Sequence, residues 1–515
     1  MKNTTQNPSD LFVFLCSGDS TFIIPSALSQ KRVLAALPEN FSTAPGNRTS
    51  HTMYIYDTFD MRLRSSGQYL LKQQDHFFLF ETKSRSITAT SKSMGKQYFF
   101  YNDFEPELCS IIKPKVDVRA LYHRFTIKTR LTSVRILNPD EKTVLIWHFI
   151  NVRVPVGGAA KVFKLLQTQS IRGYAHLKRS ISERLAREKI SETASNLFDF
   201  CFDLSRLAPV PKFKVMLNEN DPTWIAVQKI LQTLSGMIQS NREGILKNID
   251  TEFLHDFRVA MRRTRTAIGQ IKGVLPSAER QHFKGEFKTL QQRTNRLRDL
   301  DVYLLNRSDY ETLLPVSLRP GLDPFFETLN QNRQNEFRKV CRSLDSAKYE
   351  NLMRRWDRFL NKDWQRQDNL TTQNSPIKST SDQLLRKKLN KILKDGARIT
   401  KSSPIDEIHD LRIQFKNLRY LFEFFRSLYP DSMKQLITHF KAFQDYLGRL
   451  NDLSIQQEHI LTFLQGTGRG KDQRQMIAAL GGLVAVLSHE FETAHSQFKV
   501  RFQDFSSRMK ESFHF

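Results

Sequence analysis

The chain has few cysteines, four among 515 residues. Cys16, Cys109, Cys201 and Cys341 are scattered, and no two of them have the spacing of a zinc site or of a C-x-x-C redox motif. The sequence therefore does not indicate a disulfide-stabilised secreted domain or a zinc-centred fold. We expect free, mostly buried thiols in a protein of a reducing compartment.

The sequence also lacks a long apolar run. Its longest, Met476–Leu487, is well below the ~18 residues that a membrane-spanning helix needs. The apolar run Phe12–Cys16 follows only one basic residue, Lys2, so it is expected as a first strand and not as a signal peptide. We therefore expect a buried helix at Met476–Leu487, no membrane partner, and a cytoplasmic location.

Acidic residues are too few to balance the basic ones. The chain has 53 Asp and Glu against 79 Lys and Arg, which gives a formal net charge of +26 and a pI of about 9.9. Such an excess says little about fold, but it is typical of proteins that bind nucleic acid, an anionic membrane or polyphosphate. A solvated basic surface is the alternative, and composition alone does not separate the two.

The first ~155 residues favour strands, in runs separated by turn residues. We predict strands at Phe12–Leu15, Met53–Tyr56, Tyr69–Lys72, Phe77–Glu81, Phe125–Ile136 and Val144–Val154. A helical stretch is predicted from about Ala160 to Asp203, followed by a proline-containing linker at Leu207–Asp221. Helical periodicity then continues to the end, interrupted by a polar segment, Gln365–Asp382, that we predict to be a loop.

Beyond Pro222 the sequence repeats itself. One set of basic residues recurs after 154 positions: His255, Arg258, Arg262 and Arg265 match His409, Arg412, Lys416 and Arg419. A second motif recurs after 153 positions, because Phe287–Leu300 matches Phe440–Leu453, pairing Lys288 with Lys441 and Arg296 with Arg449. This duplication predicts a pseudo-two-fold helical bundle with repeats at about 222–364 and 383–515.

The first set of basic residues follows the spacing i, i+3, i+7, i+10. On a helix these positions share an arc of about 80° and extend over about 15 Å. Thr251–Leu300 holds eleven Lys or Arg against five Asp or Glu, so neighbouring acids do not neutralise the cations. Stacked like charges repel, but an anion along them removes the repulsion, and arginine suits phosphate because it donates two parallel hydrogen bonds. The pattern predicts binding of several linked phosphates.

The basic residues have simpler interpretations. A charge run is usually a solvated face, but the same pattern recurring by duplication disfavours that interpretation here. His255 and His409 are either phosphate ligands or residues that merely lie near a helix start. A zinc site made from these two histidines is not expected, because no Cys or second His lies at ligand spacing. An apolar stripe beside each basic face, such as Phe257 and Phe415, is expected to pack in a core.

At four motifs the sequence resembles the CHAD domains (conserved histidine α-helical domains). The motifs are His255–Arg265, Arg296–Val302, His409–Tyr420 and Leu447–Leu453, and the resemblance extends from about Pro222 to the C-terminus. It implies that residues 219–515 form an all-α, internally duplicated bundle whose basic channel binds inorganic polyphosphate. Position by position, it implies binding residues His255, Arg258, Arg262, Arg265, Arg296, His409, Arg412, Lys416, Arg419 and Arg449, with Lys288 and Lys441 as further candidates.

The N-terminal part, residues 1–200, resembles the CYTH domains, the triphosphate tunnel fold, at Tyr54–Gly67. This resemblance implies an α+β domain built on a closed antiparallel β-barrel. The family's first strand reads Glu-x-Glu-x-Lys, whereas Leu11–Leu15 holds neither residue type, and Val144–Val154 has no acid. Since carboxylates hold the Mg²⁺ in metal-assisted phosphoryl chemistry, we expect no catalytic residues, no metal and no cofactor. Lys83, Lys128 and Arg130 could line a tunnel or lie on the surface.

Three functions were compared. The first is non-enzymatic polyphosphate binding, in a cytoplasmic protein associated with polyphosphate granules. The second is hydrolysis of triphosphate or polyphosphate, which the missing carboxylates disfavour. The third is nucleic-acid binding, but proteins that bind single strands usually interleave stacking aromatics with their cations. Phe257, Phe415 and Phe422 lie on the apolar sides of the helices, and only Tyr420 is ambiguous.

Overall fold

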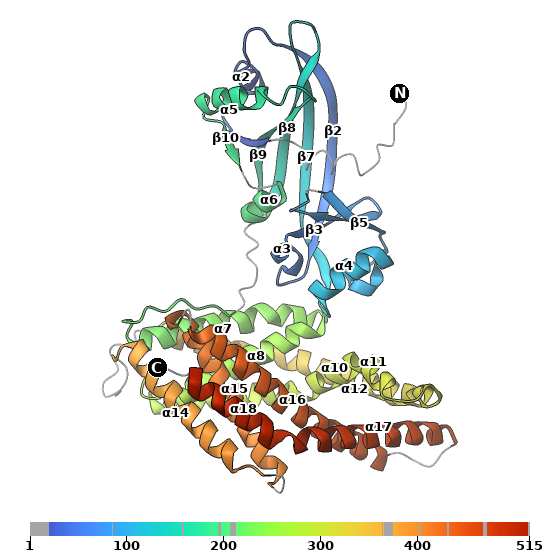
Figure 1. Cartoon of the computed structure of the whole chain (residues 1–515), viewed down its shortest axis with the longest axis vertical. Coiled ribbons are helices and arrows are strands. Elements are labelled where there is room, and N and C mark those ends of the chain that lie inside the picture. Colours follow the sequence, from blue (N-terminus) through green and yellow to red (C-terminus); the bar gives the residue numbers. More distant parts are fainter. Residues whose placement is uncertain are drawn as a thin grey trace. The chain divides into compact units, whose positions relative to one another are not determined.

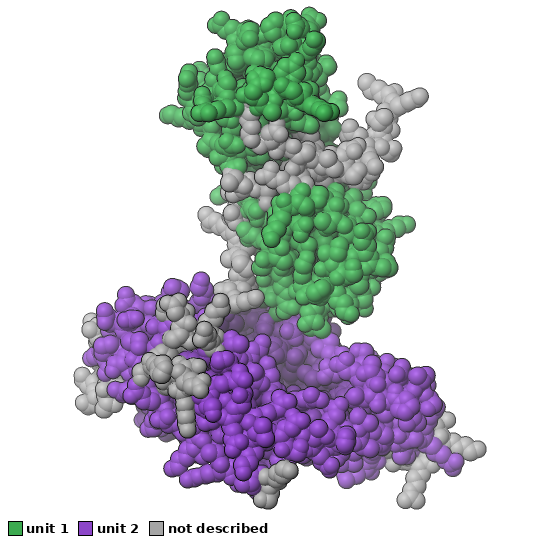
Figure 2. Space-filling model, in the orientation of Figure 1, with its two compact units in different colours: residues 1–211 green, residues 212–515 purple. Residues whose placement is uncertain are grey.

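The computed structural model divides into two compact units, residues 1–211 and 212–515 (Figure 2). It describes residues 20–84, 86–156, 159–193, 197–205, 213–362, 364, 374–400, 403–429, 432–466 and 471–512. The predicted strand Phe12–Leu15 lies outside these residues. Among the described cysteines Cys201 is buried, whereas Cys109 and Cys341 are partly exposed, so the expectation of mostly buried thiols is wrong for two of three.

The first unit is a ten-stranded antiparallel sheet in the order β10-β1-β9-β8-β7-β2-β3-β4-β5, with β6 paired to β7 (Figure 1). Its strands are β1 (Ser20–Ile24), β2 (Ser42–Asp57), β3 (Gln68–Gln73), β4 (His76–Glu81), β5 (Ser86–Lys92), β6 (Tyr98–Phe99), β7 (Leu121–Leu137), β8 (Thr143–Val156), β9 (Ala159–Ser170) and β10 (Ser191–Thr193). Its helices are α2 (Gln30–Leu34), α3 (Arg62–Ser65), η1 (Tyr101–Asp103), α4 (Pro106–Val116), α5 (Leu177–Arg187) and α6 (Leu197–Ser205). The predicted antiparallel α+β class is confirmed.

The sheet is open, so the predicted closed barrel is wrong. Within the described residues the edge strands β10 and β5 pair with other strands and not with each other. Successive strand residues point to opposite faces, and both faces bury apolar side chains: Leu165 and Ile150 lie in one core, Leu166 and Phe149 in another. Because each face already packs against its own apolar cluster, the sheet does not need to close on itself to bury its hydrophobic surface.

One face of this sheet is filled by α6. Phe198 lies 5.3 Å from Tyr69 between ring centroids, and Phe202 lies 4.8 Å from Phe125. Met53, Ile55, Leu71 and Val152 belong to the same core. Lys128 and Arg130 alternate with the buried Ile127 and Leu131, so they lie on the other face, where they are exposed; Lys83 is exposed too. Lys128 and Arg130 therefore do not line the face that α6 covers, and Lys83 lies in the turn between β4 and β5.

The predicted helical stretch from Ala160 to Asp203 is wrong in its first part. Residues 159–170 form β9, which pairs with both β8 and β1. A strand between two neighbours in a two-sided sheet buries consecutive residues, here Leu165 and Leu166, so its sequence shows no simple alternation. Among the described residues of the predicted stretch, α5 and α6 are the helical parts.

The second unit is helical. Its helices are α7 (Thr223–Leu246), α8 (Thr251–Gln270), α9 (Ser277–Arg293), α10 (Asn295–Leu305), α11 (Arg307–Thr312), η2 (Val316–Leu322), α12 (Asp323–Leu344), α13 (Ala347–Leu360), α14 (Ile377–Arg398), α15 (Ile405–Phe425), η4 (Arg426–Leu428), α16 (Ser432–Gln465), α17 (Lys471–Ser496) and α18 (Phe498–Ser512). The predicted all-α region is confirmed. The predicted loop Gln365–Asp382 is wrong for its last residues, because α14 begins at Ile377; its polar Ser381 is buried and hydrogen-bonded to Tyr429.

The starts of α7 and α14 lie side by side. The backbone N–H of Thr223 donates to the carbonyl of Ser375, and the N–H of Ile377 donates to the carbonyl of Asp221, both at 2.9 Å. At the 154-residue offset Thr223 corresponds to Ile377, and Asp221 corresponds to Ser375. Each bond is therefore the symmetry mate of the other, as expected of a duplicated pair of helices. In the first half, α7 also packs closely on α8: a Cβ on Gly244 of α7 would lie 2.1 Å from the Phe253 ring of α8.

One helix in the described part of the chain, α17, contains a segment long and apolar enough to cross a membrane, Gln473–Ser496. Length and composition alone also fit a core helix. Met476, Leu480 and Leu483 of this segment are buried in a cluster with side chains of η2 and α12. One face of α17 therefore packs against η2 and α12 in the core of the second unit.

Candidate anion-binding site on α8 and α15

Two capped helices position the duplicated basic residues. The carboxylate of Asp250 accepts the N–H groups of Glu252 (2.9 Å) and Phe253 (3.2 Å), which starts α8 ahead of His255. Pro404 precedes α15. The predicted apolar stripes are confirmed, because Phe257, Met261, Thr264 and Ile268 of α8 and Leu411, Phe415, Leu418 and Phe422 of α15 are all at most 1% exposed.

Polar side chains join α8 to α15 beside the basic faces. Thr266 donates to Oδ1 of Asn417 (3.0 Å), and Nε of Arg262 donates to the hydroxyl of Tyr420 (3.4 Å). Residue numbers rise along α8 as they fall along α15, so the helices run antiparallel where they meet. Arg263 also pairs with Glu423 at 2.5 Å. These contacts bring the basic faces of both repeats together.

The centre of the cluster is Lys416. Burial, followed by the neighbouring charges of Arg412 and Arg262, lowers the pKa of Lys416 to about 7, although Asp452 raises it. The amino group of Lys416 makes no hydrogen bond or ion pair within the described part of the chain. Four cations from two helices therefore share one region: Arg262, Arg412, Lys416 and Arg419.

Arg412 and Arg419 are less exposed than residues on an open helix surface. Their side chains are 15% and 26% exposed. Nη2 of Arg412 lies 3.6 Å from Oδ1 of Asp452, and Nε of Arg419 lies 3.4 Å from Oε1 of Glu423. Arg412 is thus paired across α15 and α16, and Arg419 is paired within α15 to the Glu423 that also contacts Arg263 of α8, which keeps both guanidinium groups in place for a ligand.

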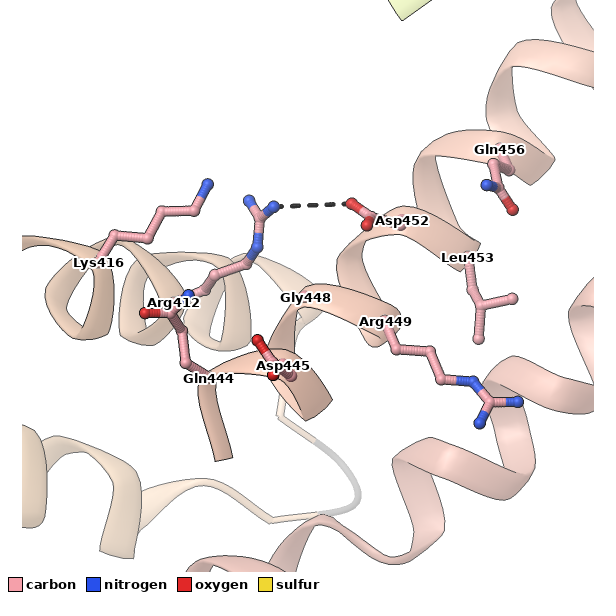
Figure 3. A pocket seen from close by; sticks show the side chains of 9 residues that line it. All are labelled: Arg412, Lys416, Gln444, Asp445, Gly448, Arg449, Asp452, Leu453 and Gln456. Atoms are coloured by element: carbon pink, nitrogen blue, oxygen red, sulfur yellow. Dashed lines mark ion pairs between the residues drawn. The ribbon is translucent and has the colours of Figure 1, made fainter. Parts of the chain in front are cut away.

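A pocket of about 430 Å³ opens beside Arg412 and Lys416. Figure 3 shows both side chains extending on the same side of α15, with Arg412 directed at Asp452. Residues of α16 complete the lining: Gln444, Asp445, Gly448, Arg449, Asp452, Leu453 and Gln456. The guanidinium of Arg449 extends away from the other two cations (Figure 3) and pairs with Glu490 of α17 at 3.2 Å.

The other predicted residues do not join this cluster. Arg258 and Arg265 bond to Gln291 of α9, through its carbonyl (3.2 Å) and its side-chain oxygen (2.8 Å) respectively. Nη1 of Arg296 lies 3.0 Å from Nε2 of His459, and Nδ1 of His409 lies 2.9 Å from Oδ1 of Asn451. Lys288 and Lys441 are exposed on α9 and α16, and His255 is partly buried on α8.

Sequence reasoning missed the neutral and acidic partners. Asn417 and Glu423 join the two repeats, and Gly448 borders the pocket. One signal was available in the sequence: at the 154-residue offset Arg263 stands where the second repeat has Asn417, and Thr266 stands where it has Tyr420. Positions at which the two repeats carry different residues are candidates for contacts between the repeats. Such contacts, as between Thr266 and Asn417, join residues of different type.

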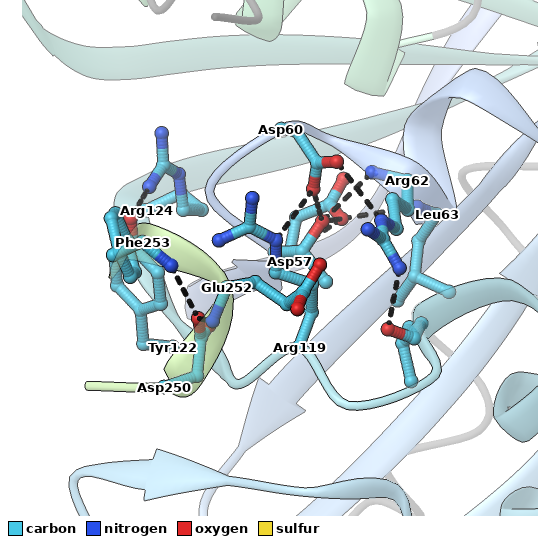
Figure 4. A network of polar contacts seen from close by, with 12 residues as sticks. Asp57, Asp60, Arg62, Leu63, Arg119, Tyr122, Arg124, Asp250, Glu252 and Phe253 are labelled. Carbon is cyan, nitrogen blue, oxygen red and sulfur yellow. Dashed lines mark hydrogen bonds and ion pairs between the residues drawn. The ribbon is translucent and has the colours of Figure 1, made fainter. Parts of the chain in front are cut away.

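The acidic residues of the N-terminal motif are bound within their own turn (Figure 4). The Asp57 carboxylate accepts the N–H groups of Thr58 (2.7 Å), Leu63 (3.1 Å) and Arg64 (3.0 Å). It is 1% exposed, and burial raises the pKa of Asp57 to about 6. Asp60 accepts from Nε of Arg62 at 2.9 Å and lies 3.8 Å from Nε of the buried Arg119. Within the described residues no three His, Cys, Asp or Glu side chains come together as possible metal ligands.

Residues 229–461 match the family model of the CHAD domain. The helical unit contains a CHAD domain. The predicted resemblance is thus confirmed for these residues, and α8, α15 and the pocket lie within the CHAD domain.

Two solved structures are also similar. The crystal structure of the CHAD domain from the plant Ricinus communis is 22% identical, with a TM-score of 0.48, over 57% of this chain and 96% of that chain. PptA from Streptomyces chartreusis is 17% identical, with a TM-score of 0.40, over 55% of this chain and 100% of that one. No curated protein matches the chain. The assignment of the domain rests on the family match and not on these two similarities.

Proposed function

We propose that this protein binds inorganic polyphosphate, without hydrolysing it, through the cations that α8 and α15 bring together in its CHAD domain. The CHAD match supports this ligand, because the resemblance implies polyphosphate binding. The single observation that carries the proposal is the environment of Lys416, a partly buried lysine surrounded by Arg262, Arg412 and Arg419. A polyanion along these groups would remove their mutual repulsion.

The shape of the site supports a phosphate chain better than a nucleic-acid strand. Tyr420, the one ring near the cations whose role was ambiguous, is 4% exposed, and its hydroxyl is engaged by Arg262. The guanidinium groups of Arg263 and Arg419 each lie 5.6 Å from its centroid. With its ring covered in this way, Tyr420 offers no platform on which a base could stack.

The N-terminal unit supports a non-catalytic role. Three backbone N–H groups occupy the Asp57 carboxylate, and two arginines lie at Asp60, so neither carboxylate is poised to hold a metal ion against substrate phosphates. The apolar core under α6 fills one sheet face with Phe, Leu, Ile and Val side chains. We propose a structural or regulatory role for this unit in a cytoplasmic, granule-associated protein.

The test is a competition with the full chain at one fixed salt concentration. Labelled polyphosphate of defined length is bound, and unlabelled polyphosphate, RNA and DNA are compared as competitors at equal phosphate concentration. We expect polyphosphate to compete best. RNA or DNA competing equally well would overturn the assigned ligand. Phosphate release from tripolyphosphate or polyphosphate with Mg²⁺, abolished by a chelator, would overturn the non-enzymatic assignment.

A further inference from the structure

The two copies of the duplicated second motif have different backbones. In the first repeat the helix is interrupted at Thr294, where α9 ends and α10 begins. In the second repeat α16 runs without a break from Ser432 to Gln465, through the matching residues. At the 153-residue offset, Thr294 and Asn295 correspond to Leu447 and Gly448.

In the first repeat Arg258 is bound to this break. Its Nη1 donates to the carbonyl of Gln291 (3.2 Å), the hydroxyl of Thr294 (2.8 Å) and Oδ1 of Asn295 (2.8 Å). Carbonyl groups at a helix C-terminus lack an intrahelical partner, and basic side chains near that end can satisfy them. Arg258 is 8% exposed, so its guanidinium is used inside the protein.

In the second repeat the matching Arg412 has no such break to bind. Leu447 and Gly448 offer no side-chain acceptor, and the unbroken α16 keeps its backbone carbonyls in helical hydrogen bonds. The guanidinium of Arg412 makes no hydrogen bond in the described part of the chain and has the 3.6 Å pairing of Nη2 with Asp452, whereas Nη1 of Arg258 makes three hydrogen bonds. The Asp452 side chain is 62% exposed, so it can turn to solvent when another anion binds Arg412.

Gly448 leaves room next to Arg412. A Cβ placed on Gly448 would meet no atom within 4 Å, and the residue lines the pocket of about 430 Å³. Glycine is unfavourable in a helix interior, so its presence in the middle of α16 calls for a local reason. The open space beside two cations is such a reason.

We infer that the two repeats have divided their roles: the pocket at Gly448, Arg412 and Lys416 is a phosphoryl subsite, whereas the matching place in the first repeat is closed because Thr294 and Asn295 hold Arg258. This inference rests on the proposed function and names the half of the site that takes a phosphoryl group. Asp445 and Asp452 line the same pocket, and a phosphoryl oxygen replaces Asp452 at Arg412. Gln444 provides a neutral donor.

The test places the first-repeat side chain in the second repeat. Gly448→Asn in the full chain should weaken polyphosphate binding roughly tenfold, as expected for the loss of a charge-assisted hydrogen bond. The melting temperature should not fall, since asparagine suits a helix better than glycine. Gly285→Asn is the matched control, because Gly285 is also a helical glycine with no atom within 4 Å of an added Cβ. We expect this control to bind like wild type.

The second pair of variants compares the matching arginines. Arg258→Met should lower the melting temperature by about 5 °C or more and change the affinity of the folded protein less than twofold. Arg412→Met should leave the melting temperature nearly unchanged and weaken polyphosphate binding. If wild type binds polyphosphate and Gly448→Asn binds equally well, the inference is wrong while the proposed function stands. An Arg258→Met variant that keeps its melting temperature and loses affinity overturns it too. Wild type that does not bind overturns the proposed function itself.

Discussion

The two units use charged motif residues in opposite ways. In the N-terminal unit Asp57 is 1% exposed and accepts three backbone N–H groups, and Asp60 lies beside Arg62 and Arg119. In the CHAD domain Lys416 lies among cations, and Asp452 is the acid that raises its pKa. Charges that satisfy each other within the fold stabilise it, whereas several cations gathered around a lysine that makes no ion pair of its own in the described residues indicate an anionic ligand.

The largest effect is expected at the cation cluster. Replacing Arg412 and Arg419 together with Ala should weaken polyphosphate binding by at least ~10-fold, because hydrogen bonds to charged groups contribute about 1.5–3 kcal/mol each. The dependence of affinity on salt should become shallower, since fewer counterions are released on binding. The fold should persist: Glu423 keeps its contact with Arg263, and Asp452 is 62% exposed. Titration at several salt concentrations measures both quantities.

The matched control removes two arginines of α12. Arg338 and Arg342 are exposed and lie on neither α8 nor α15. Replacing both with Ala changes the net charge by the same amount as the Arg412 and Arg419 double variant. This control should lose much less affinity. Equal losses of polyphosphate affinity in the two double variants would show that the protein attracts polyphosphate diffusely. The cation cluster would then not be a specific binding site.

A second effect, of comparable or smaller size, concerns pH. Since the pKa of Lys416 is lowered to about 7 in the ligand-free protein, this lysine is charged at pH 6 and mostly neutral at pH 8. A bound polyanion favours the charged form, so binding takes up a proton at pH 8 and affinity falls as pH rises through 7. The expected decrease between pH 6 and pH 8 is about tenfold. Titrations at both pH values check it.

Lys416→Arg provides the control for this pH dependence. Arginine stays charged at both pH values, while the titration of the polyphosphate end groups and of the histidines is unchanged. The affinity of the variant for polyphosphate should therefore fall much less between pH 6 and pH 8 than that of wild type. A Lys416→Arg protein with the same pH dependence as wild type would show that another group causes it.

The smallest effect on affinity is expected in the N-terminal unit. Asp57→Ala leaves two buried N–H groups and one partly buried N–H group without an acceptor, which should destabilise the turn between β2 and α3 by at least ~2 kcal/mol. Polyphosphate affinity should stay within about twofold of wild type, a change of under 0.5 kcal/mol. Hydrogen exchange should rise in β2, β3 and α3 and stay constant in α8 and α15. Increased exchange in α8 or α15, or a large loss of affinity, would contradict the separation of roles.

Helix periodicity and duplication were enough to predict the α8 and α15 helices and their apolar stripes, and the resemblance of four motifs predicted the CHAD domain. Those features depend on local spacing, which one sequence shows directly. The residues that meet across the repeats, such as Arg263 with Glu423, depend on how two helices cross, and spacing along one helix does not contain that information. The fate of Arg258 depends on a helix break at Thr294 that the motif Phe287–Leu300 does not signal, because its second copy is unbroken.

In the sheet unit the strand positions were easier to predict than the topology. The runs at Tyr69–Lys72 and Phe77–Glu81 are strands β3 and β4. The assignment of residues 159–170 as helix was wrong because a strand buried on both faces loses the alternation that identifies strands. Closure of the sheet could not be predicted, because it depends on what covers each face, and here α6 covers one of them.

The central claim is that polyphosphate contacts the cations around Lys416, and competitive labelling of lysines measures this most directly. The full chain is treated with a limiting amine-reactive reagent at pH 8, with and without saturating polyphosphate, and each lysine is quantified by mass spectrometry. Lys416 should be labelled in the free protein, because its lowered pKa leaves it largely neutral, and protected in the complex. Lys348, exposed on α13, should react equally in both. Unchanged labelling of Lys416 at saturation would contradict the account.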